Sequence, residues 1–514
     1  MLTAVARRRL AVALFIFVWF AYLATASGRL KTADVQREFK VAANLLDHGG
    51  LEGENNLDAR IGVDGKPYAT SGIAASIILI PAALVGGGSQ TEKAIFVEDM
   101  VNPLLAAGTV TLLLLLLLDM GFGGRVATAI CLVFAFATIE WPYAHDAFDV
   151  TAAGAVTLLA VVAARRRAEG GSLGALLLSG ISLGVALLIR ISSGLLLVPL
   201  AAYLAWKRRR QGAVAVVREL AMWAVPIVVG LAVQGWHDWV RFGNAFDVGA
   251  RYPLQAYVQP LANQGLAFIG LLVSPGKGIL LFSPIFVLGA IGLVRLVRRD
   301  ASFALLTVAI VVFHLVFYAR INPWSGDQAW GPRYLVPVVP FFMLWTAPAL
   351  ASWRELGRVA KAAVGVLVAA GVAVQATVIL TGYERVIEAM DQPPPPQTVS
   401  DPGWYFVIGN SQLLRQFKAV GAMLFGPNPF GPYATANGSN GLTYLYTPDL
   451  WWADPWSTPG LRPFLVLVAV LLLLLVVLSG LRLLKAVRAL PQEGAAGALA
   501  GSPVIKSEQV SQIL

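Results

Sequence analysis

Long apolar blocks alternate with short polar stretches along the entire chain of 514 residues. Most blocks come close to the roughly 20 apolar residues that a helix needs to cross the hydrocarbon core of a bilayer. Composition agrees, because 57% of the residues are hydrophobic and only 13% are charged, about half the charged fraction of soluble domains. The pattern predicts an all-α polytopic membrane protein of about twelve spans, near residues 10–27, 95–118, 125–141, 148–165, 172–190, 191–206, 217–238, 278–295, 301–318, 334–350, 360–380 and 463–484.

Basic residues gather in short clusters beside the apolar blocks. Such clusters mark the cytoplasmic ends of spans, so we expect a multi-pass protein of the inner (plasma) membrane with both termini in the cytoplasm. The net charge of +10 comes from these clusters and not from a basic soluble surface, which argues against nucleic acid as a partner. The clusters are Arg7–Arg9, Arg165–Arg167, Lys207–Arg210, Arg295–Arg299, Arg354–Lys361 and Arg482–Arg488.

One apolar block must stay out of the bilayer if every basic cluster is to fall on the same side. The best candidate is Ile73–Gly88, which is short, contains Pro81 and ends in three glycines. We expect it to form an interfacial or re-entrant helix. Arg190, between two spans with almost no connecting loop, then lies at the outer surface, which a long cationic side chain can reach.

This topology predicts four parts. Residues 1–380 form a transmembrane catalytic module with a long outer loop at 28–94, and residues 381–462 form an irregular cap outside the cytoplasm. A last transmembrane helix at 463–484 leads into a cytoplasmic tail at 485–514. The cap is rich in proline, glycine and tryptophan, without a run of charges.

The long outer loop begins with Asp34, a few residues after the first span. In a helix, Arg37 and Glu38 lie on the same face as Asp34 and give it an internal charge partner. A carboxylate held at the membrane surface in this way is a candidate catalytic group. The alternative is that these residues are solvated charges on a polar loop.

A second outer turn, WPYAHDAFD, places His145, Asp146 and Asp149 at the mouth of two spans. Ionisable groups near a bilayer are costly to bury and tend to mark function, so we expect one of the three to bind or catalyse. A histidine with carboxylates can also ligate a divalent cation. The spacing matches no recognised metal motif, so the metal stays unknown, and no other cofactor is indicated.

A third outer stretch, WSGDQAWGPRY at residues 324–334, leads into a span through a rigid Gly-Pro step. Arg333 then lies at the depth of lipid headgroups, where its planar guanidinium can bind a phosphate. Aromatic residues here can form an interfacial belt or stack on sugars. The candidate substrate-binding residues are Trp324, Asp327, Trp330 and Tyr334.

The turn within GLLVSPGKGILLFSP, residues 270–284, interrupts an apolar stretch with Lys277 between two glycines. Glycine lets the backbone approach a ligand closely, and an amine suits a phosphate. A simple loop with one lysine reaching the membrane surface explains the same residues equally well. The cysteine count adds little, because a single Cys131 allows no intramolecular disulfide.

Taken in order, these stretches resemble the GT-C superfamily of polyprenyl-phosphate-sugar-dependent glycosyltransferases. The matching features are the loop that opens with Asp34, a GKPYATSG step into the short block with Pro81, the HDAFD turn, the SPGKGILLFSP turn and the pattern W-x-G-x-x-x-W-G-P-R-Y. The chain is most similar to bacterial relatives of protein O-mannosyltransferases and lipid A aminoarabinose transferases. The resemblance covers residues 1 to about 380 and does not extend to the cap.

The resemblance implies a GT-C-like bundle that transfers a sugar from a polyprenyl-phosphate donor to a lipid, glycan or protein acceptor on the outer face, with inversion. It further implies that Asp34 is the catalytic base, that Asp146 or Asp149 is the second acidic residue, and that Arg333 or Lys277 binds the donor phosphate. Protein O-mannosyltransferases open this loop with an Asp-Glu pair, whereas Val35 follows Asp34 here. That difference weakens the case for a protein acceptor.

Two other classes share parts of this pattern. An O-antigen ligase or polymerase uses related substrates and keeps a large outer loop late in the chain. A lipid or glycan transporter is also polytopic, but such proteins place ionisable residues at mid-membrane and often contain inverted repeats. The chain shows no repeat, and its polar residues crowd one face.

Overall fold

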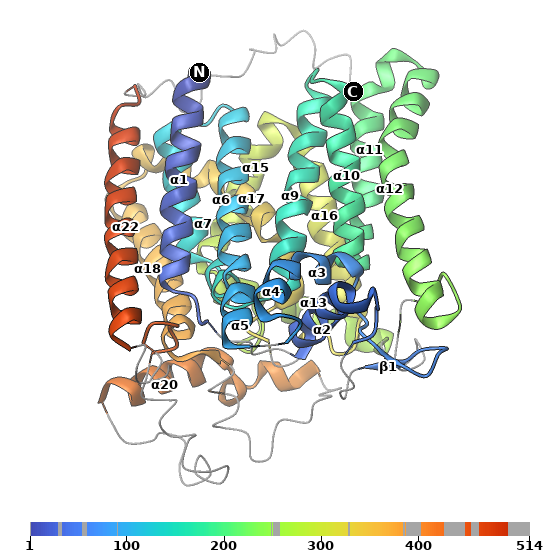
Figure 1. Cartoon of the computed structure of the whole chain (residues 1–514). Coiled ribbons are helices and arrows are strands. Elements are labelled where there is room, and N and C mark those ends of the chain that lie inside the picture. Colours follow the sequence, from blue (N-terminus) through green and yellow to red (C-terminus); the bar gives the residue numbers. More distant parts are fainter. Residues whose placement is uncertain are drawn as a thin grey trace.

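The computed structural model describes residues 2–28, 33–53, 59–89, 91–247, 249, 258–326, 329–383, 386, 402–425, 448–453 and 462–491. Each predicted span contains a helix, and these helices stand side by side (Figure 1). They are α1 (Ala4–Ala24), α6 (Val101–Asp119), α7 (Gly124–Ala137), α9 (Asp149–Ala168), α10 (Leu173–Ile189), α11 (Leu197–Arg208), α12 (Ala213–Phe242), α15 (Gly289–Arg299), α16 (Ala301–Arg320), α17 (Val339–Ala351), α18 (Arg358–Thr381) and α22 (Arg462–Arg488).

Six helical segments within the described residues are long and apolar enough to cross a membrane: Lys93–Asp119, Ala213–Phe242, Ala301–Arg320, Arg333–Glu355, Arg358–Thr381 and Val466–Arg488. The predicted class, an all-α polytopic membrane protein, is confirmed, while the number of spans stays a prediction.

The outermost helices are the least covered by protein. Only 22% of the most apolar window of α12 and 17% of that of α22 are buried, so both present apolar side chains to lipid.

Three of the predicted spans begin with a tighter 3₁₀ segment. η1 (Ile191–Leu196) precedes α11, and η5 (Arg333–Val338) precedes α17. Before α15 come a short α14 (Ile279–Phe282) and η4 (Pro284–Leu288). Proline accounts for two of these breaks, since it lacks the N–H that a regular helix requires.

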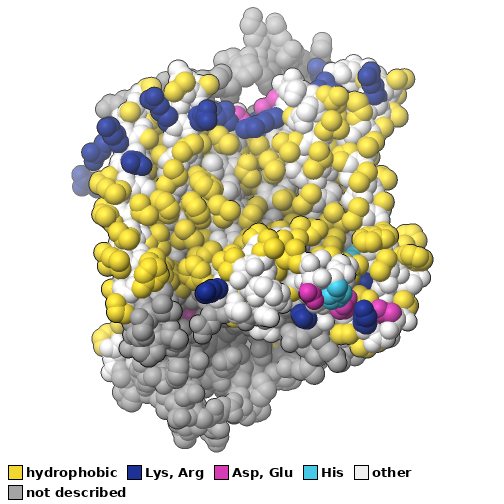
Figure 2. All heavy atoms as spheres, viewed as in Figure 1, with side chains coloured by type: hydrophobic (Ala, Val, Ile, Leu, Met, Phe, Trp, Pro, Cys, Tyr) yellow, Lys and Arg dark blue, Asp and Glu magenta, His cyan; other side chains and the backbone are white. Residues whose placement is uncertain are grey.

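The basic clusters meet at one end of the bundle, which we call the basic rim. Asp119 forms ion pairs with Arg7 (2.5 Å) and Arg166 (3.0 Å), and Asp300 pairs with Arg165 (3.4 Å). Helix α1 begins and α22 ends at this rim (Figure 1). Figure 2 shows a row of Lys and Arg there, above a broad belt of hydrophobic side chains.

The opposite end, which we call the polar rim, carries the shorter helices and the hairpin (Figure 1). Two helices of six and seven residues replace the block Ile73–Gly88, so its predicted failure to cross is confirmed. Pro81 lies in the first turn of the second of them, where a missing N–H costs nothing. The elements of this rim are α2 (Ala33–His48), β1 (Arg60–Ile61), β2 (Pro67–Tyr68), α3 (Ile73–Ile78), α4 (Ile80–Gly86), α5 (Glu92–Asp99), α8 (Glu140–His145), α13 (Leu261–Val273) and α20 (Gln412–Phe425).

Helix α13 was not among the predicted elements. Its 13 residues span about 20 Å, less than the roughly 30 Å of a hydrocarbon core. Just before it, the backbone N–H of Gln259 donates to the carbonyl of Arg320 (3.0 Å), and just after it, that of Gly276 donates to Tyr405 (2.9 Å). Both ends of α13 therefore lie at the polar rim. Because the chain enters and leaves α13 at the same rim, the predicted directions of the later spans are unchanged.

The described part of the predicted cap is more regular than expected. Besides η7 (Pro402–Phe406) and η8 (Ile408–Asn410), it contains the helix α20, which buries Gln416, Ala419 and Ala422 at helical spacing. The Gln416 side chain donates to the Thr381 hydroxyl at the end of α18 (2.6 Å). The rest of the cap and the tail from residue 492 lie outside the described residues.

Candidate active site

Helix α2 carries Asp34 in its first turn, near the positive end of the helix dipole. The Asp34 side chain is 41% exposed, whereas Arg37, its ion-pair partner one turn later, is buried. Val35 and Phe39 fix the helix, because they pack into a small apolar cluster with α4. The predicted pairing of Asp34 with Arg37 on one face is confirmed.

Arg333, at the start of η5, reaches the same carboxylate. Its Nη1 lies 3.3 Å from Oδ2 of Asp34, and its guanidinium lies over the rings of Tyr334 and Phe148, 5.3 and 5.8 Å from their centroids. Gly326 makes room for this side chain. Its φ is +74°, and a Cβ there would come within 2.7 Å of Cγ of Arg333, which explains one glycine of the WSGDQAWGPRY stretch.

Asp149 and Arg190 form a second ion pair beside the first. Both carboxylate oxygens of Asp149 accept from Nη1 of Arg190, at 2.7 and 2.8 Å. Asp149 begins α9, and Arg190 follows the end of α10, so two packed helices hold the pair. Arg190 therefore lies at the polar rim, as predicted.

Glu38, one turn after Asp34, completes the set. Its side chain is buried, and burial raises the pKa of the Glu38 carboxyl, as do the charges of Asp149 and Asp34. Burial also works to raise the pKa of Asp34, but Arg333, Arg37 and Arg190 outweigh it and hold that pKa below its ordinary value. We call the six residues the acid–arginine cluster: Asp34, Arg37, Glu38, Asp149, Arg190 and Arg333.

Tyr334 faces a second tyrosine at the edge of this cluster. Its ring is stacked on that of Tyr318, with centroids 4.4 Å apart and an interplanar angle of 8°. The Tyr318 hydroxyl donates to Oγ of Ser192 (2.7 Å). One face of Tyr334 is therefore covered by protein.

The two tryptophans of the third outer stretch are packed inside the protein. Trp324 is 2% exposed and meets Tyr405 edge to face, and Trp330 is 1% exposed and meets Phe282 in the same way. Neither ring presents an open face to a sugar in this conformation. The candidate Asp327 lies outside the described residues.

Lys277 is also fully buried. Its Nζ donates to the carbonyl of Ala329 (2.5 Å), and the neighbouring Pro275 carbonyl accepts from the hydroxyl of Ser411 (2.7 Å). The turn thus connects the third outer stretch to the cap. Lys277 is not among the charges that shift the pKa of Asp34, which are all arginines.

The other two members of the HDAFD turn belong to a separate group. His145, Asp146 and Asp449 are all buried, and one ligand atom from each lies within 4.8 Å of the others. Nε2 of His145 is 3.2 Å from Asp449 and 3.8 Å from Asp146. We call these three residues the histidine cluster, which joins the turn to the segment 448–453 of the cap.

The second ring nitrogen of His145 decides what this cluster can hold. Nδ1 contacts the carbonyl oxygen of Thr25, which can only accept, so Nδ1 carries a proton. Nε2 faces two carboxylates, and a lone pair there would be repelled by them. A proton shared with one of the carboxyl groups, or a divalent cation between the three groups, removes this repulsion, and a carbonyl-bound histidine with carboxylates is a suitable ligand set for such an ion.

Asn102 of α6 holds the turn between the two clusters. Its side-chain amide donates to the carbonyls of Asp146 (2.7 Å) and Phe148 (3.1 Å). His145 is thereby directed to the cap and Asp149 to Arg190. The turn that looked like one site in the sequence serves two.

Neither a protein-family model nor a curated protein matches the chain. Among solved structures, ArnT from Cupriavidus metallidurans bound to undecaprenyl phosphate aligns with a TM-score of 0.51 at 17% identity, over 94% of this chain and 78% of that one. The chain has the fold of ArnT. The multi-pass helical bundle that the sequence resemblance implies is thus confirmed as a fold. The archaeal oligosaccharyltransferase AglB from Archaeoglobus fulgidus, in complex with an inhibitory peptide and a dolichol-phosphate, aligns with a TM-score of 0.43 at 12% identity, over 80% and 64% of the two chains.

Sequence reasoning missed one member of the histidine cluster and one further buried acid, Asp99, which belongs to neither cluster. Asp449 stands in the cap beside two tryptophans with no spacing that relates it to His145. Asp99 lies in a predicted span, and its Oδ2 accepts from the backbone N–H of Gly28 (2.6 Å). Two adjacent carboxylates, Glu98 and Asp99, within an apolar run are a signal that could have been used.

Proposed function

We propose that the chain is a membrane glycosyltransferase that moves a sugar from a polyprenyl-phosphate-linked donor to an acceptor hydroxyl with inversion. The observation that supports this most directly is a half-exposed, ionised Asp34 flanked by Arg37 and Arg333 at the edge of the apolar belt. The ArnT structure, whose fold the chain has, holds undecaprenyl phosphate. A polyprenyl chain cannot leave the bilayer cheaply, so the reacting groups must lie at its surface.

Asp34 would act as the base. In the transfer, the acceptor oxygen forms a bond to the anomeric carbon while its proton passes to Asp34. The bond between that carbon and the phosphate oxygen breaks on the opposite face of the sugar. Such general-base assistance typically contributes 10²–10⁴-fold to a rate.

Arg333 would serve the leaving phosphate. A phosphate can accept two parallel hydrogen bonds from the guanidinium of Arg333. This bidentate interaction is stronger than the one long contact that Arg333 makes with Asp34. Binding of the donor would draw Arg333 away and remove one of the charges that lower the pKa of Asp34. The base would thus become stronger when the donor is in place, while Arg37 and Arg190 keep the site positive.

The cytoplasm would face the basic rim, and the active site would open on the extracytoplasmic side of the inner membrane. Cysteine labelling can test this, because the single Cys131 is buried. In intact spheroplasts, an impermeant maleimide should label Asp47→Cys at the polar rim and leave Arg298→Cys at the basic rim unlabelled. Labelling of the second variant alone would overturn the orientation.

Activity is best tested on the purified chain in nanodiscs, with radiolabelled polyprenyl-phosphate sugars as donors and fractions of bacterial envelope lipid, glycan and protein as acceptors. We expect labelled product from at least one donor, with the anomeric configuration inverted. Asp34→Asn should abolish it, whereas Asp47→Asn, an exposed acid on the same helix, should not. Full turnover by Asp34→Asn would remove Asp34 from the mechanism, and a retained configuration would exclude direct transfer.

A further inference from the structure

The first residue of the cap helix α20 binds the backbone of the third outer stretch. The side-chain oxygen of Gln412 accepts from the backbone N–H of Gly331 (3.0 Å), and its side-chain nitrogen donates to the carbonyl of Ala329 (3.1 Å). The orientation of this amide is fixed, because a backbone N–H can only donate and a carbonyl can only accept. One side chain of the cap thus holds two successive backbone groups of the stretch that leads to Arg333.

From Gly331 the connection continues directly to Arg333. The carbonyl of Gly331 accepts from the backbone N–H of Arg333 (3.1 Å). Gly331 adopts a φ of +54°, and a Cβ there would come within 2.7 Å of the ring of Phe282. Phe282 and Gln412 therefore leave this turn little room to move, and its conformation sets the position from which the Arg333 side chain extends.

The cap end of this connection is itself anchored to the bundle. Ser411, directly before Gln412, donates its hydroxyl hydrogen to the carbonyl of Pro275 (2.7 Å). The carbonyl that Gln412 binds also accepts from Nζ of Lys277 (2.5 Å). Pro275 and Lys277 belong to the turn between α13 and α14, so Gln412 connects the Arg333 turn to a fixed point of the bundle.

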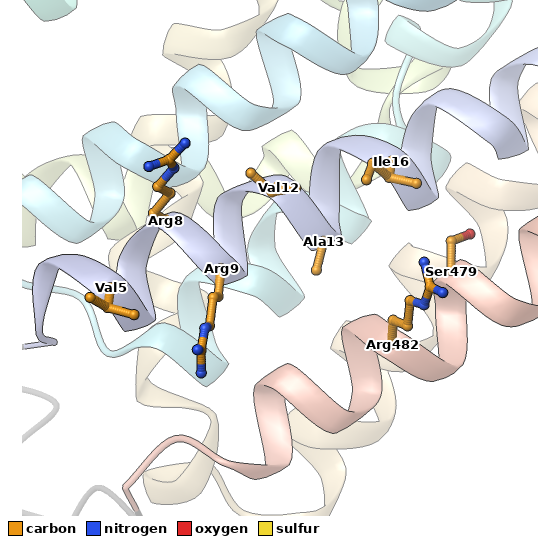
Figure 3. A pocket seen from close by; sticks show the side chains of 8 residues that line it. All are labelled: Val5, Arg8, Arg9, Val12, Ala13, Ile16, Ser479 and Arg482. Atoms are coloured by element: carbon orange, nitrogen blue, oxygen red, sulfur yellow. The ribbon is translucent and has the colours of Figure 1, made fainter.

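Arginines that only line a cavity are arranged differently. Those around the groove between α1 and α22 at the basic rim point in different directions (Figure 3) and do not form one anion site: they are Arg8, Arg9 and Arg482. Arg333, by contrast, is held at its backbone by the Gly331 turn, while its guanidinium lies over an aromatic ring and against a carboxylate. A guanidinium must keep one orientation to give a phosphate two parallel hydrogen bonds.

We propose that Gln412 is a positioning residue for the donor phosphate, and that the cap thereby takes part in forming the active site. Through the Gly331 turn, Gln412 holds Arg333 in the orientation in which its guanidinium binds the phosphate. The inference rests on the proposed function, because it is there that Arg333 is assigned to the leaving phosphate. It gives a role to the cap, to which the resemblance in sequence does not extend.

Two glutamines of α20 allow a matched test. Gln412→Leu removes both hydrogen bonds and keeps the approximate size of the side chain. Gln416→Leu makes the same change one helical turn later, where it removes a hydrogen bond to Thr381 (2.6 Å) and leaves the Arg333 turn untouched. In nanodiscs, hydrogen exchange of the Gly331 amide should become about tenfold faster in Gln412→Leu, because one hydrogen bond is lost, and should keep its wild-type rate in Gln416→Leu.

Phosphate binding is the second measurement, and it requires no turnover. Native mass spectrometry uses undecaprenyl phosphate as the probe and undecaprenol, which lacks the phosphate, as the comparison. Retention of undecaprenyl phosphate should weaken about fivefold in Gln412→Leu, with that of undecaprenol unchanged. In assays of sugar transfer, the KM for the donor should rise and the acidic limb of kcat/KM should move up by about half a pH unit, because Arg333 helps to lower the pKa of Asp34.

Faster exchange at Gly331 with unchanged retention of undecaprenyl phosphate would show that Gln412 only anchors the cap, and would overturn the proposal. Unchanged exchange, equal losses in Gln416→Leu, or a wild type that retains no more undecaprenyl phosphate than undecaprenol would overturn it as well. A wild type that retains undecaprenyl phosphate but transfers no sugar would count against the proposed function, and the two glutamine variants would still decide the role of Gln412.

Discussion

The acid–arginine cluster and the histidine cluster share the turn that carries His145, Asp146 and Asp149, but they differ in burial and in charge. His145 and Asp449 are fully buried, whereas Asp34 keeps 41% of its side chain exposed. In the first cluster three guanidiniums surround the carboxylates of Asp34 and Asp149, and the pKa of the third acid, Glu38, is raised by burial. In the second, two carboxylates face one imidazole whose other nitrogen is occupied by a carbonyl. Similar residue types therefore support different roles, because exposure decides which cluster a substrate can reach.

The two clusters also differ in whether a substrate phosphate can reach their charged groups. A substrate phosphate can exchange with Asp34 at Arg333, because Asp34 is 41% exposed and the contact between the two side chains is long, at 3.3 Å. A substrate phosphate cannot enter between the buried side chains of His145 and Asp449 unless the cap moves away. We therefore propose that the first cluster carries the chemistry and that the second anchors residues 448–453.

The largest expected effect divides the two clusters directly. Asp34→Asn should lower turnover by about 10²–10⁴-fold while changing the free energy of unfolding by less than about 1 kcal/mol, because the pair is partly exposed. Asp449→Asn should do the reverse. It should lose about 3 kcal/mol of stability, because it removes the nearer of the two carboxyl groups that face the buried His145, and the folded fraction should keep its turnover.

Turnover assays and thermal unfolding in detergent measure the two quantities on the same samples. Loss of turnover in folded Asp449→Asn protein would show that the histidine cluster takes part in the chemistry. The histidine cluster would then belong to the active site.

The second prediction concerns the cation. If a divalent ion occupies the histidine cluster, elemental analysis should find about one Zn²⁺ or Mn²⁺ per chain in the wild type and none in Asp449→Asn. Chelation should then lower the stability of the wild type by about 2 kcal/mol, the linkage expected at a concentration well above the dissociation constant, and leave the variant unchanged. Wild-type protein that contains no metal would instead mean that a proton, and not a cation, joins the three groups.

The two clusters also differ in how far sequence could predict them. Hydropathy and charge are local, so the spans, the common rim of the basic clusters, the interfacial block with Pro81 and the Asp34–Arg37 pair could all be predicted. The contact of Arg333 with Asp34 joins residues 299 positions apart, and that of His145 with Asp449 joins residues 304 apart. Such pairs depend on how the helices pack, which no local pattern encodes.

Packing also explains the roles that sequence could not assign to the aromatic residues. Trp324 and Trp330 stand in a polar stretch and looked accessible, yet Gly270 and Phe282 receive their rings. Helix α13 escaped prediction for a related reason. It is apolar but too short to cross, and the contacts of the flanking Gln259 with Arg320 and of Gly276 with Tyr405 show that both of its ends lie at the polar rim.

A third prediction uses pH to examine the acid–arginine cluster. Arg333 helps to lower the pKa of Asp34, so Arg333→Gln should raise that pKa, and activity should be lost at a higher pH as the solution is acidified. We expect the acidic limb of kcat/KM to move up by about one pH unit, with a tenfold or greater loss at neutral pH. Arg60→Gln, which removes an arginine paired with Asp247 at the same rim, should leave the limb in place. An unmoved limb in Arg333→Gln would mean that Asp34 is not the titrating base.

The smallest expected effect is on stability and concerns Glu38. Its pKa is raised in the folded protein, chiefly by burial, so the folded state binds the proton more tightly than the unfolded state does. Stability should therefore fall as the pH rises from the ordinary glutamate range toward the raised pKa.

Glu38→Gln removes this loss and should stabilise the protein by about 1 kcal/mol at pH 8 with little change at pH 4. Glu52→Gln is the opposite control. Burial works to raise the pKa of Glu52, but the hydrogen bond from His48 and the charge of Lys66 together outweigh it and lower that pKa, so this variant should lose stability at pH 8. Thermal unfolding at the two pH values measures both, and a Glu38→Gln protein that is less stable at pH 8 would show that the ionised carboxylate is needed to hold Arg37 and Arg190 together.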